Sequence, residues 1–171
     1  MGRRVVAGVS GSPGSLTALH RAAAEARERD AELWVVLAWQ VPGGGLGSRS
    51  SCDTSMLMEC RAAAVERLRE TLDTAFGAAR PGVTTAGLTV RGTPGPALVD
   101  TARASDDLLV VGAGPRGGLL GAVRPSVARY CLSHAPCPVL AVPPNPLQAE
   151  LEAVHRRNAW RIPLDARELA D

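Results

Sequence analysis

The sequence predicts an α/β fold of the Rossmann-like kind, with a five-stranded parallel sheet in the order 3-2-1-4-5 and helices on both faces. Short apolar runs that end in Gly, Ser or Pro are typical of strands buried on both sides. Segments with helical spacing separate these runs, and such alternation favours parallel strands joined by right-handed crossovers. The length of 171 residues suits one domain, 1–143, followed by a C-terminal helical or extended arm, 144–171.

The first predicted strand, 5–9, leads directly into a helix. Ser12 can cap this helix and Pro13 suits its first position. Apolar residues recur at helical spacing up to the charged stretch 27–30, where we expect the helix to end. The apolar stretch 33–39 is the second predicted strand.

A long loop and a long helix follow. The stretch 41–53 is rich in Gly and Ser, which indicates a loop. A helix is predicted over 54–78, with a packing role for its apolar face. Alternation over 83–90 indicates a strand with one solvent-facing side, at an edge of the sheet. The apolar face of the helix consists of Val65, Leu68, Leu72 and Phe76.

The second half of the chain completes the pattern. We expect a short helix over 97–104, a buried strand over 108–111, a helix that begins near Ser126, and a fifth strand over 139–142. In the order 3-2-1-4-5 that last strand lies at an edge, yet it is continuously apolar. An open apolar edge promotes aggregation, so we predict that a second subunit covers it and that the protein is a homodimer through this strand.

Two loops are predicted to meet where a ligand would bind. In doubly wound sheets, ligands bind at the carboxyl ends of the strands, at the point where the strand order reverses. The loop "VSGSPGS" follows the first strand and the stretch "GAGPRGGLLGAVRPSVAR" follows the fourth. The sequence therefore predicts a site between these loops.

Composition excludes several classes of function. The formal net charge of +2 is weak and dispersed, which argues against nucleic acid or a membrane surface as partner. The chain contains no lysine, which excludes a P-loop lysine and Schiff-base chemistry. The apolar runs are too short to span a bilayer, and the cysteine spacing suits a reducing compartment. We expect a cytoplasmic protein.

No catalytic or metal-binding constellation is evident. Cys131, His134 and Cys137 have helical spacing, but Pro136 interrupts the helix that a shared metal would need. The glycines after the first strand follow G-x-x-G-x-x-G, which is not the dinucleotide pattern. The histidines have no visible nucleophile or carboxylate partner, so we predict that the protein is not an enzyme. They are His20, His134 and His155.

Three segments together resemble the universal stress protein family. They are "VVAGVSGSPGS", "LLVVGAGPRGGLLGAVRPSV" and "SHAPCPVLAVP", and the resemblance covers residues 3 to 143. It implies a dimer with the sheet order given above and a regulatory or protective role in the stress response, generally without catalysis. Many members of that family bind ATP through a G-x-x-G-x-nine-G-[S/T] loop.

The resemblance carries over to only part of this ATP motif. Gly112 matches the first glycine, and Ser126 with Val127 matches the residues after the last one. With Val9 at the end of the first strand, these residues are the nucleotide-binding candidates that the resemblance implies. No catalytic residue and no metal ligand is implied.

Three substitutions in the motif predict that ATP binds weakly or not at all. Pro115 and Pro125 replace the second and last glycines, and proline has no N–H to donate to phosphate. Ser10 stands where the family's usual aspartate helps to hold the adenosine. Arg116 and Arg124 could compensate with guanidinium contacts, so an adenine-nucleotide sensor is the alternative to a nucleotide-impaired regulator with an unidentified protein partner.

The tail carries enough apolar residues to argue against disorder. One group has helical spacing and a second group lies in an extended-looking stretch. We expect an arm that packs on its own domain or crosses to the dimer partner. The two groups are Leu147, Leu151 and Val154, and Trp160, Ile162 and Leu164.

Overall fold

The computed structural model contains one sheet of five parallel strands in the order β3-β2-β1-β4-β5, which confirms the predicted topology. It describes residues 2–41, 54–77, 80–114 and 126–145. Most of the predicted loop 41–53 and of the arm 144–171 lies outside these residues. The elements in chain order are β1 (Arg4–Val9), α1 (Pro13–Glu28), β2 (Glu32–Trp39), α2 (Thr54–Phe76), β3 (Thr85–Arg91), α3 (Pro94–Thr101), β4 (Leu108–Gly112), α4 (Val127–His134) and β5 (Val139–Val142).

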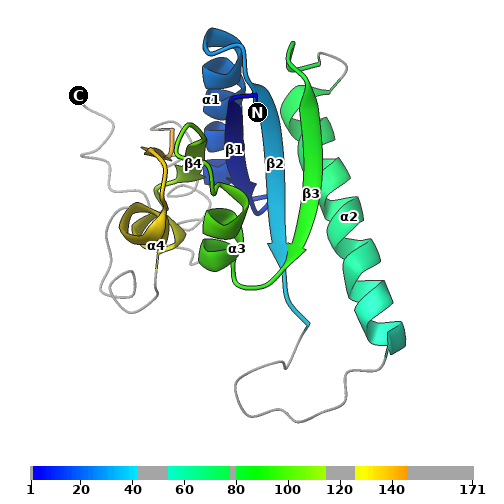
Figure 1. The fold of residues 1–171 in the computed structure, drawn as a ribbon. Helices are drawn as coiled ribbons and strands as arrows, with labels where there is room; N and C mark the ends of the chain where they lie inside the picture. Colours follow the sequence, from blue (N-terminus) through cyan, green and yellow to red (C-terminus); the bar gives the residue numbers. More distant parts are fainter. Residues whose placement is uncertain (1, 42–53, 78–79, 115–125, 146–171) are drawn as a thin grey trace, which may run out of the picture.

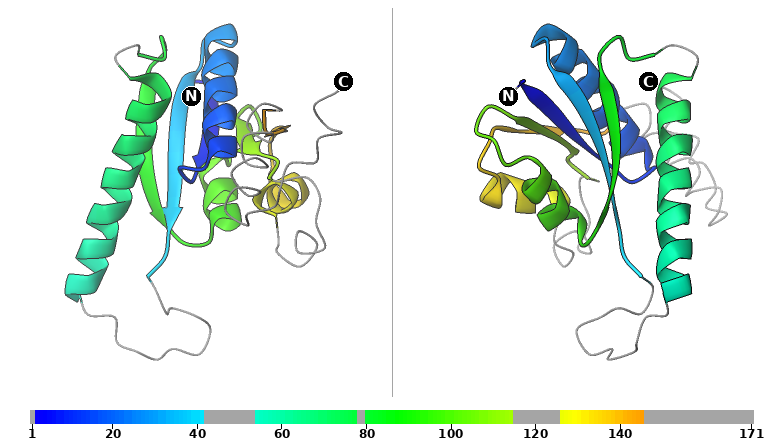
Figure 2. Two further views of the ribbon diagram at one scale, coloured as in Figure 1. Left: turned by 180° about the vertical axis from the view of Figure 1, so that it is seen from behind. Right: turned by 45° about the vertical axis from the view of Figure 1, so that its right-hand side comes forward.

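Helices cover both faces of the sheet. Figure 1 and the two views of Figure 2 show α1 and α2 on one face and α3 and α4 on the other. Two separate apolar cores result. Val5 and Ala7 of β1 belong to the core under α1 and α2, whereas Val6 between them belongs to the core with α3 and α4. This alternation explains why both faces of the central strands are apolar after their first residues.

Helix α1 begins as its sequence predicts. Ser12 is the N-cap, its side chain accepts a hydrogen bond from the backbone N–H of Ser15, and Pro13 is the first helical residue. Helix α3, by contrast, begins at Pro94 and ends at Thr101, so the predicted range 97–104 was wrong by three residues at each end. The first turn of a helix needs no backbone N–H, so the prolines in "TPGP" fit inside it.

Helix α2 extends beyond the sheet. It begins at Thr54 as predicted, and its buried residues are Ala64, Leu68 and Thr71. Residues 54–63 include no buried side chain, and Figures 1 and 2 show the first turns of α2 lying past the carboxyl ends of β2 and β3. Helix α2 therefore extends beyond the carboxyl ends of the strands.

The two outer strands differ as the sequence indicates. β3 alternates exposed and half-buried residues over most of its length, which fits an edge with one solvent-facing side. β5 pairs with β4 on one side, and all four of its residues are half-buried. Within the described residues no strand pairs with the other side of β5.

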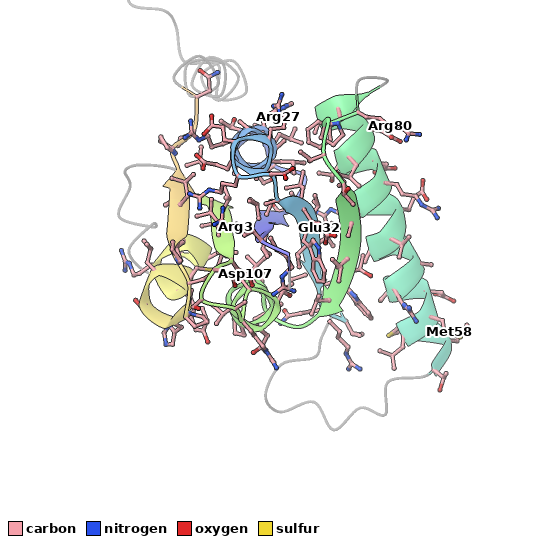
Figure 3. All side chains as sticks on the ribbon, turned by 45° about the horizontal axis from the view of Figure 1, so that its top comes forward. Arg3, Arg27, Glu32, Met58, Arg80 and Asp107 are labelled. Carbon is pink, nitrogen blue, oxygen red and sulfur yellow. The ribbon has the colours of Figure 1, made fainter. Side chains whose placement is uncertain are left out.

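An ion pair joins the beginnings of β1 and β4 at the amino end of the sheet. Nε of Arg4 lies 2.9 Å from Oδ1 of Asp107, and Nη2 lies 2.6 Å from Oδ2. Asp107 is 2% exposed and also accepts a hydrogen bond from the backbone N–H of Ala104. The guanidinium lies over the ring of Trp34, and its hydrogen bond to Asp107 raises the pKa of Arg4. Figure 3 shows Asp107 between the two layers of helices.

This geometry predicts that Arg4→Met destabilises the fold. The substitution leaves a buried carboxylate without its cation, which costs about 3–5 kcal/mol for a fully buried pair. Because Arg4 itself is partly exposed, we expect a loss of about 2–3 kcal/mol in urea unfolding. The control is Arg103→Met, which removes an exposed ion pair with Asp100 and should change stability little. Equal stability of the two variants would contradict the prediction.

Candidate functional site

The strand order reverses between β1 and β4. From β1 the chain passes to β2 on one side, and from β4 it passes to β5 on the other. The two strands pair in parallel, with Val5 opposite Leu108 and Ala7 opposite Val110. Their carboxyl ends, at Val9 and Gly112, therefore lie at the kind of crevice where doubly wound sheets bind ligands.

The turn from β1 to α1 is closed by its own hydroxyl groups. Gly11 has a φ of +78°, a left-handed conformation that glycine adopts without strain. Ser10 Oγ donates to Ser12 Oγ over 3.0 Å, and Ser15 Oγ donates to the Ser12 carbonyl over 2.8 Å. The backbone N–H of Ser10 in turn donates to Ser15 Oγ. The hydroxyl at the position of the family's usual aspartate is thus neutral and already engaged within the turn.

Gly112 holds the end of β4 against the first turn of α1. A Cβ at this position would lie 3.0 Å from the carbonyl oxygen of Gly14 and 3.3 Å from its carbon, so a side chain would force the backbones apart. The next residue, Ala113, donates its N–H to the Val142 carbonyl over 2.8 Å. The close approach of Gly112 to Gly14 favours glycine at position 112 whether or not a phosphate binds there.

The other predicted site residues lie on different elements. Val9 is buried in the core under α1 and α2 at the end of β1. Ser126 is the N-cap residue of α4, and its carbonyl accepts from the N–H of Tyr130. Val127 packs against the core with α3 and α4. The structure brings Val9 and Gly112 to the same edge and puts Ser126 at the start of the helix that covers β4 and β5. Their binding of nucleotide stays a prediction.

The middle of the glycine-rich loop, 115–125, lies outside the described residues. This segment contains both prolines of the altered motif and both arginines that could compensate for them. They are Pro115, Arg116, Arg124 and Pro125.

Arg67 of α2 reaches the β1–α1 turn, a contact that the sequence analysis missed. Its Nη2 donates to the carbonyl oxygen of Ser10 over 3.2 Å. The sequence places an arginine one residue before the buried Leu68, at the border of the apolar face, and such positions are ordinarily solvated. Helix α2 therefore does more than pack, because it supplies a cation beside the turn that follows β1, where the strand order reverses.

A hollow of about 220 Å³ lies between this turn and α2. Ser10 and Gly11 form one wall, Leu16 of α1 lies beside them, and α2 provides the opposite wall. We call it the α2 hollow. Its α2 residues are Arg67, Glu70, Thr71 and Thr74.

The cysteines on the opposite face of the sheet are structural. Cys131 is fully buried, and burial together with the nearby Cys137 raises the pKa of its thiol to about 11. Burial also raises the pKa of Cys137, with a further contribution from the charge of Asp107. Both thiols are therefore protonated and poor nucleophiles near neutral pH.

The described histidines make aromatic contacts. His20 lies edge-on to Phe76, and His134 stacks on Tyr130 with 4.1 Å between ring centroids. Among the described residues, no group of three His, Cys, Asp or Glu is placed to hold a metal ion. Nor does that part of the chain contain a helix both long and apolar enough to cross a bilayer.

Comparison with known proteins agrees with this geometry. No curated protein matches the chain. A universal stress protein solved in complex with cAMP is 28% identical with a TM-score of 0.63, over 84% of this chain and 99% of that one. A universal stress protein from Archaeoglobus fulgidus is 26% identical with a TM-score of 0.56, over 83% of this chain and 98% of that one.

A third structure, of a protein from the same family in Burkholderia pseudomallei, is 28% identical with a TM-score of 0.56, over 83% of this chain and 96% of that one. These likenesses extend over nearly the whole of each related chain. The model of the universal stress protein family matches residues 1–143, which include every strand and helix described above. The chain therefore belongs to the universal stress protein family.

Proposed function

We propose that this protein is a non-catalytic regulatory or protective member of its family, acting in the cytoplasm as a homodimer whose ATP binding is weak or lost. Its protein partner in the stress response is unidentified, and neither nucleic acid nor a membrane is proposed as a ligand. The observation that carries the proposal is the chemistry of the β1–α1 turn, where Ser10 offers a neutral hydroxyl already bonded within the turn.

The state of the reactive side chains supports a role without catalysis. Covalent catalysis needs a thiolate or an activated hydroxyl beside a base. The buried thiols have raised pKa values, and the rings of His20 and His134 contact other rings rather than a nucleophile. Within the described residues, no side chains are arranged as a nucleophile with its base.

Two features of the sequence support weak nucleotide binding. A hydrogen bond to a charged group contributes about 1.5–3 kcal/mol, so each amide lost to proline should weaken phosphate binding about tenfold to a hundredfold. Pro115 and Pro125 remove two such amides from the motif. Ser10 replaces a charged acceptor by a neutral one, which weakens a hydrogen bond to a ribose hydroxyl.

The alternative function is an adenine-nucleotide sensor at the loops after β1 and β4. It is favoured by the universal stress protein solved with cAMP, which is 28% identical to this chain. In this alternative, Arg116 or Arg124 supplies the donors that the prolines lack.

Two observations support the proposed dimer: β5 is an apolar edge strand, and the resemblance to the family implies a dimer. β5 is apolar throughout and pairs with β4 on one side only within the described residues. A second copy of β5 could add to this edge and satisfy its backbone groups. The arm, from residue 144 on, is proposed to pack on the domain or on the partner.

Titration calorimetry with ATP and magnesium tests the main proposal. We expect no dissociation constant below the high-micromolar range for the natural sequence. Replacing both Pro115 and Pro125 by glycine restores two N–H donors, so the double variant should bind ATP at least about tenfold more tightly. The control is Pro81→Gly, since Pro81 lies before β3 at the other end of the sheet. Low-micromolar binding by the natural sequence would contradict the proposal.

Native mass spectrometry of gently purified protein distinguishes the two functions. The main proposal predicts a mass that corresponds to the polypeptide alone, because weakly held ATP dissociates during purification. The sensor predicts a retained adenine nucleotide. Its loss on replacing Arg116 and Arg124 by glutamine would identify those side chains as the compensating donors.

Sedimentation and hydrogen exchange test the dimer. We expect a dimer at micromolar concentration, and slower amide exchange in residues 139–142 as the concentration rises, because pairing protects the edge. Exchange in β3, at the other edge, provides the internal control. Deleting residues 145–171 should weaken the dimer or lower its stability if the arm packs as proposed. A monomer at micromolar concentration would refute the β5 interface.

A further inference from the structure

We propose that the α2 hollow binds the phosphate or carboxylate group of a small hydroxyl- or amino-bearing molecule, with Arg67 as its principal cation. The hollow lies on the α2 side of the β1–α1 turn, whereas the altered glycine motif follows β4. It shares Ser10 with the proposed nucleotide site, but its cation comes from α2, so the proposal does not depend on ATP binding.

The guanidinium of Arg67 has donors to spare. An arginine carries five N–H donors, and the one hydrogen bond that the Arg67 side chain makes within the described residues uses a single Nη2–H, given to the Ser10 carbonyl. Two other helix arginines are paired with carboxylates, Arg69 with Glu66 and Arg21 with Glu25. Arg67 has no such partner among the described residues, so its charge is free to bind an anion.

Arg67 is also directed toward the turn before any ligand arrives. Its hydrogen bond to Ser10 spans 57 positions of the sequence and orients the far end of this exposed side chain. Its own backbone carbonyl accepts from Oγ1 of Thr71, which is 4% exposed and anchors this turn of α2. Nε lies close to Gly11, where an added Cβ would be 3.9 Å away. A cation fixed in this way loses less entropy when it binds.

The size and lining of the hollow define the ligand class. At about 220 Å³ it exceeds the roughly 30 Å³ of one water but is below the roughly 300–1,000 Å³ of sites for drug-sized molecules. The hollow is open to solvent, and the part of a ligand that it holds is therefore an anionic group with a few neighbouring atoms. Thr74 and Ser10 offer hydroxyls and Leu16 an apolar wall. Glu70 can accept from a hydroxyl or amine of the ligand, which favours sugar phosphates and amino or hydroxy acids over bare anions.

Nuclear magnetic resonance of the full chain tests the proposal directly, through the Arg67 Nε–H signal. Inorganic phosphate and ribose 5-phosphate should shift this signal, whereas ribose should not. Arg67→Gln keeps a donor for the Ser10 carbonyl but removes the charge, and it should weaken ribose 5-phosphate binding at least about tenfold. Arg69→Gln, two residues away on the same helix, is the matched control and should leave binding unchanged. Glu70→Gln should strengthen binding of inorganic phosphate, because it removes a like charge.

The source of the anion is decided by a titration with AMP. If AMP shifts Arg67 together with the Gly112 amide, the phosphate belongs to a nucleotide that spans both sites. If ribose 5-phosphate shifts Arg67 while AMP has no effect, the hollow serves a separate metabolite. The proposal fails if no phosphate compound shifts the Arg67 signal, or if Arg67→Gln binds ribose 5-phosphate as the natural sequence does. Loss of ATP binding alone would not affect it.

Discussion

Burial of β1 and β4 on both faces is the constraint on which the rest of the structure depends. Val5, Val6 and Ala7 of β1 and Leu109 and Val110 of β4 have no exposed surface, and alternate residues serve opposite cores. A sheet with such a centre must have helices on both sides, and parallel strands then send every following loop to one edge. The β1–α1 turn and the end of β4 meet there because of this packing, whatever they bind.

At that edge, packing constrains one residue of the proposed nucleotide site and leaves another unconstrained. Gly112 is favoured by its close approach to the backbone of Gly14, so packing gives a reason for this glycine that does not involve ATP. Ser10 is free of such a packing demand, since it is exposed and its hydrogen bonds to other described residues lie within the turn or come from Arg67. A residue retained for packing survives a loss of binding, whereas an exposed ligand-binding residue does not have to. If ATP binding is lost as proposed, packing accounts for the glycine at 112, and a serine is tolerated at position 10.

The fold was predictable because its signals are local. The apolar runs, the cap at Ser12 and the proline at position 13 are each sufficient to identify an element. The α3 boundary was missed because helical periodicity begins at the apolar residues, although Pro94 had already started the helix. Arg67 could not have been predicted, because its contact with Ser10 depends on the rotation of α2 about its axis. Leu68 and Ala64 set that rotation by packing against strands far away in the sequence.

The link between Arg67 and Ser10 also bears on how two occupants at this edge would affect each other. The guanidinium donates one N–H to the turn, and an anion in the α2 hollow can use the others without breaking that bond. Binding there would then leave the β1–α1 turn in place, and with it the contact of Gly14 against Gly112. Any coupling to a nucleotide at β4 would be electrostatic rather than conformational, and two phosphates sharing one nearby cation repel each other. Salt screens that repulsion, so occupants of the two sites would antagonise each other most strongly at low ionic strength.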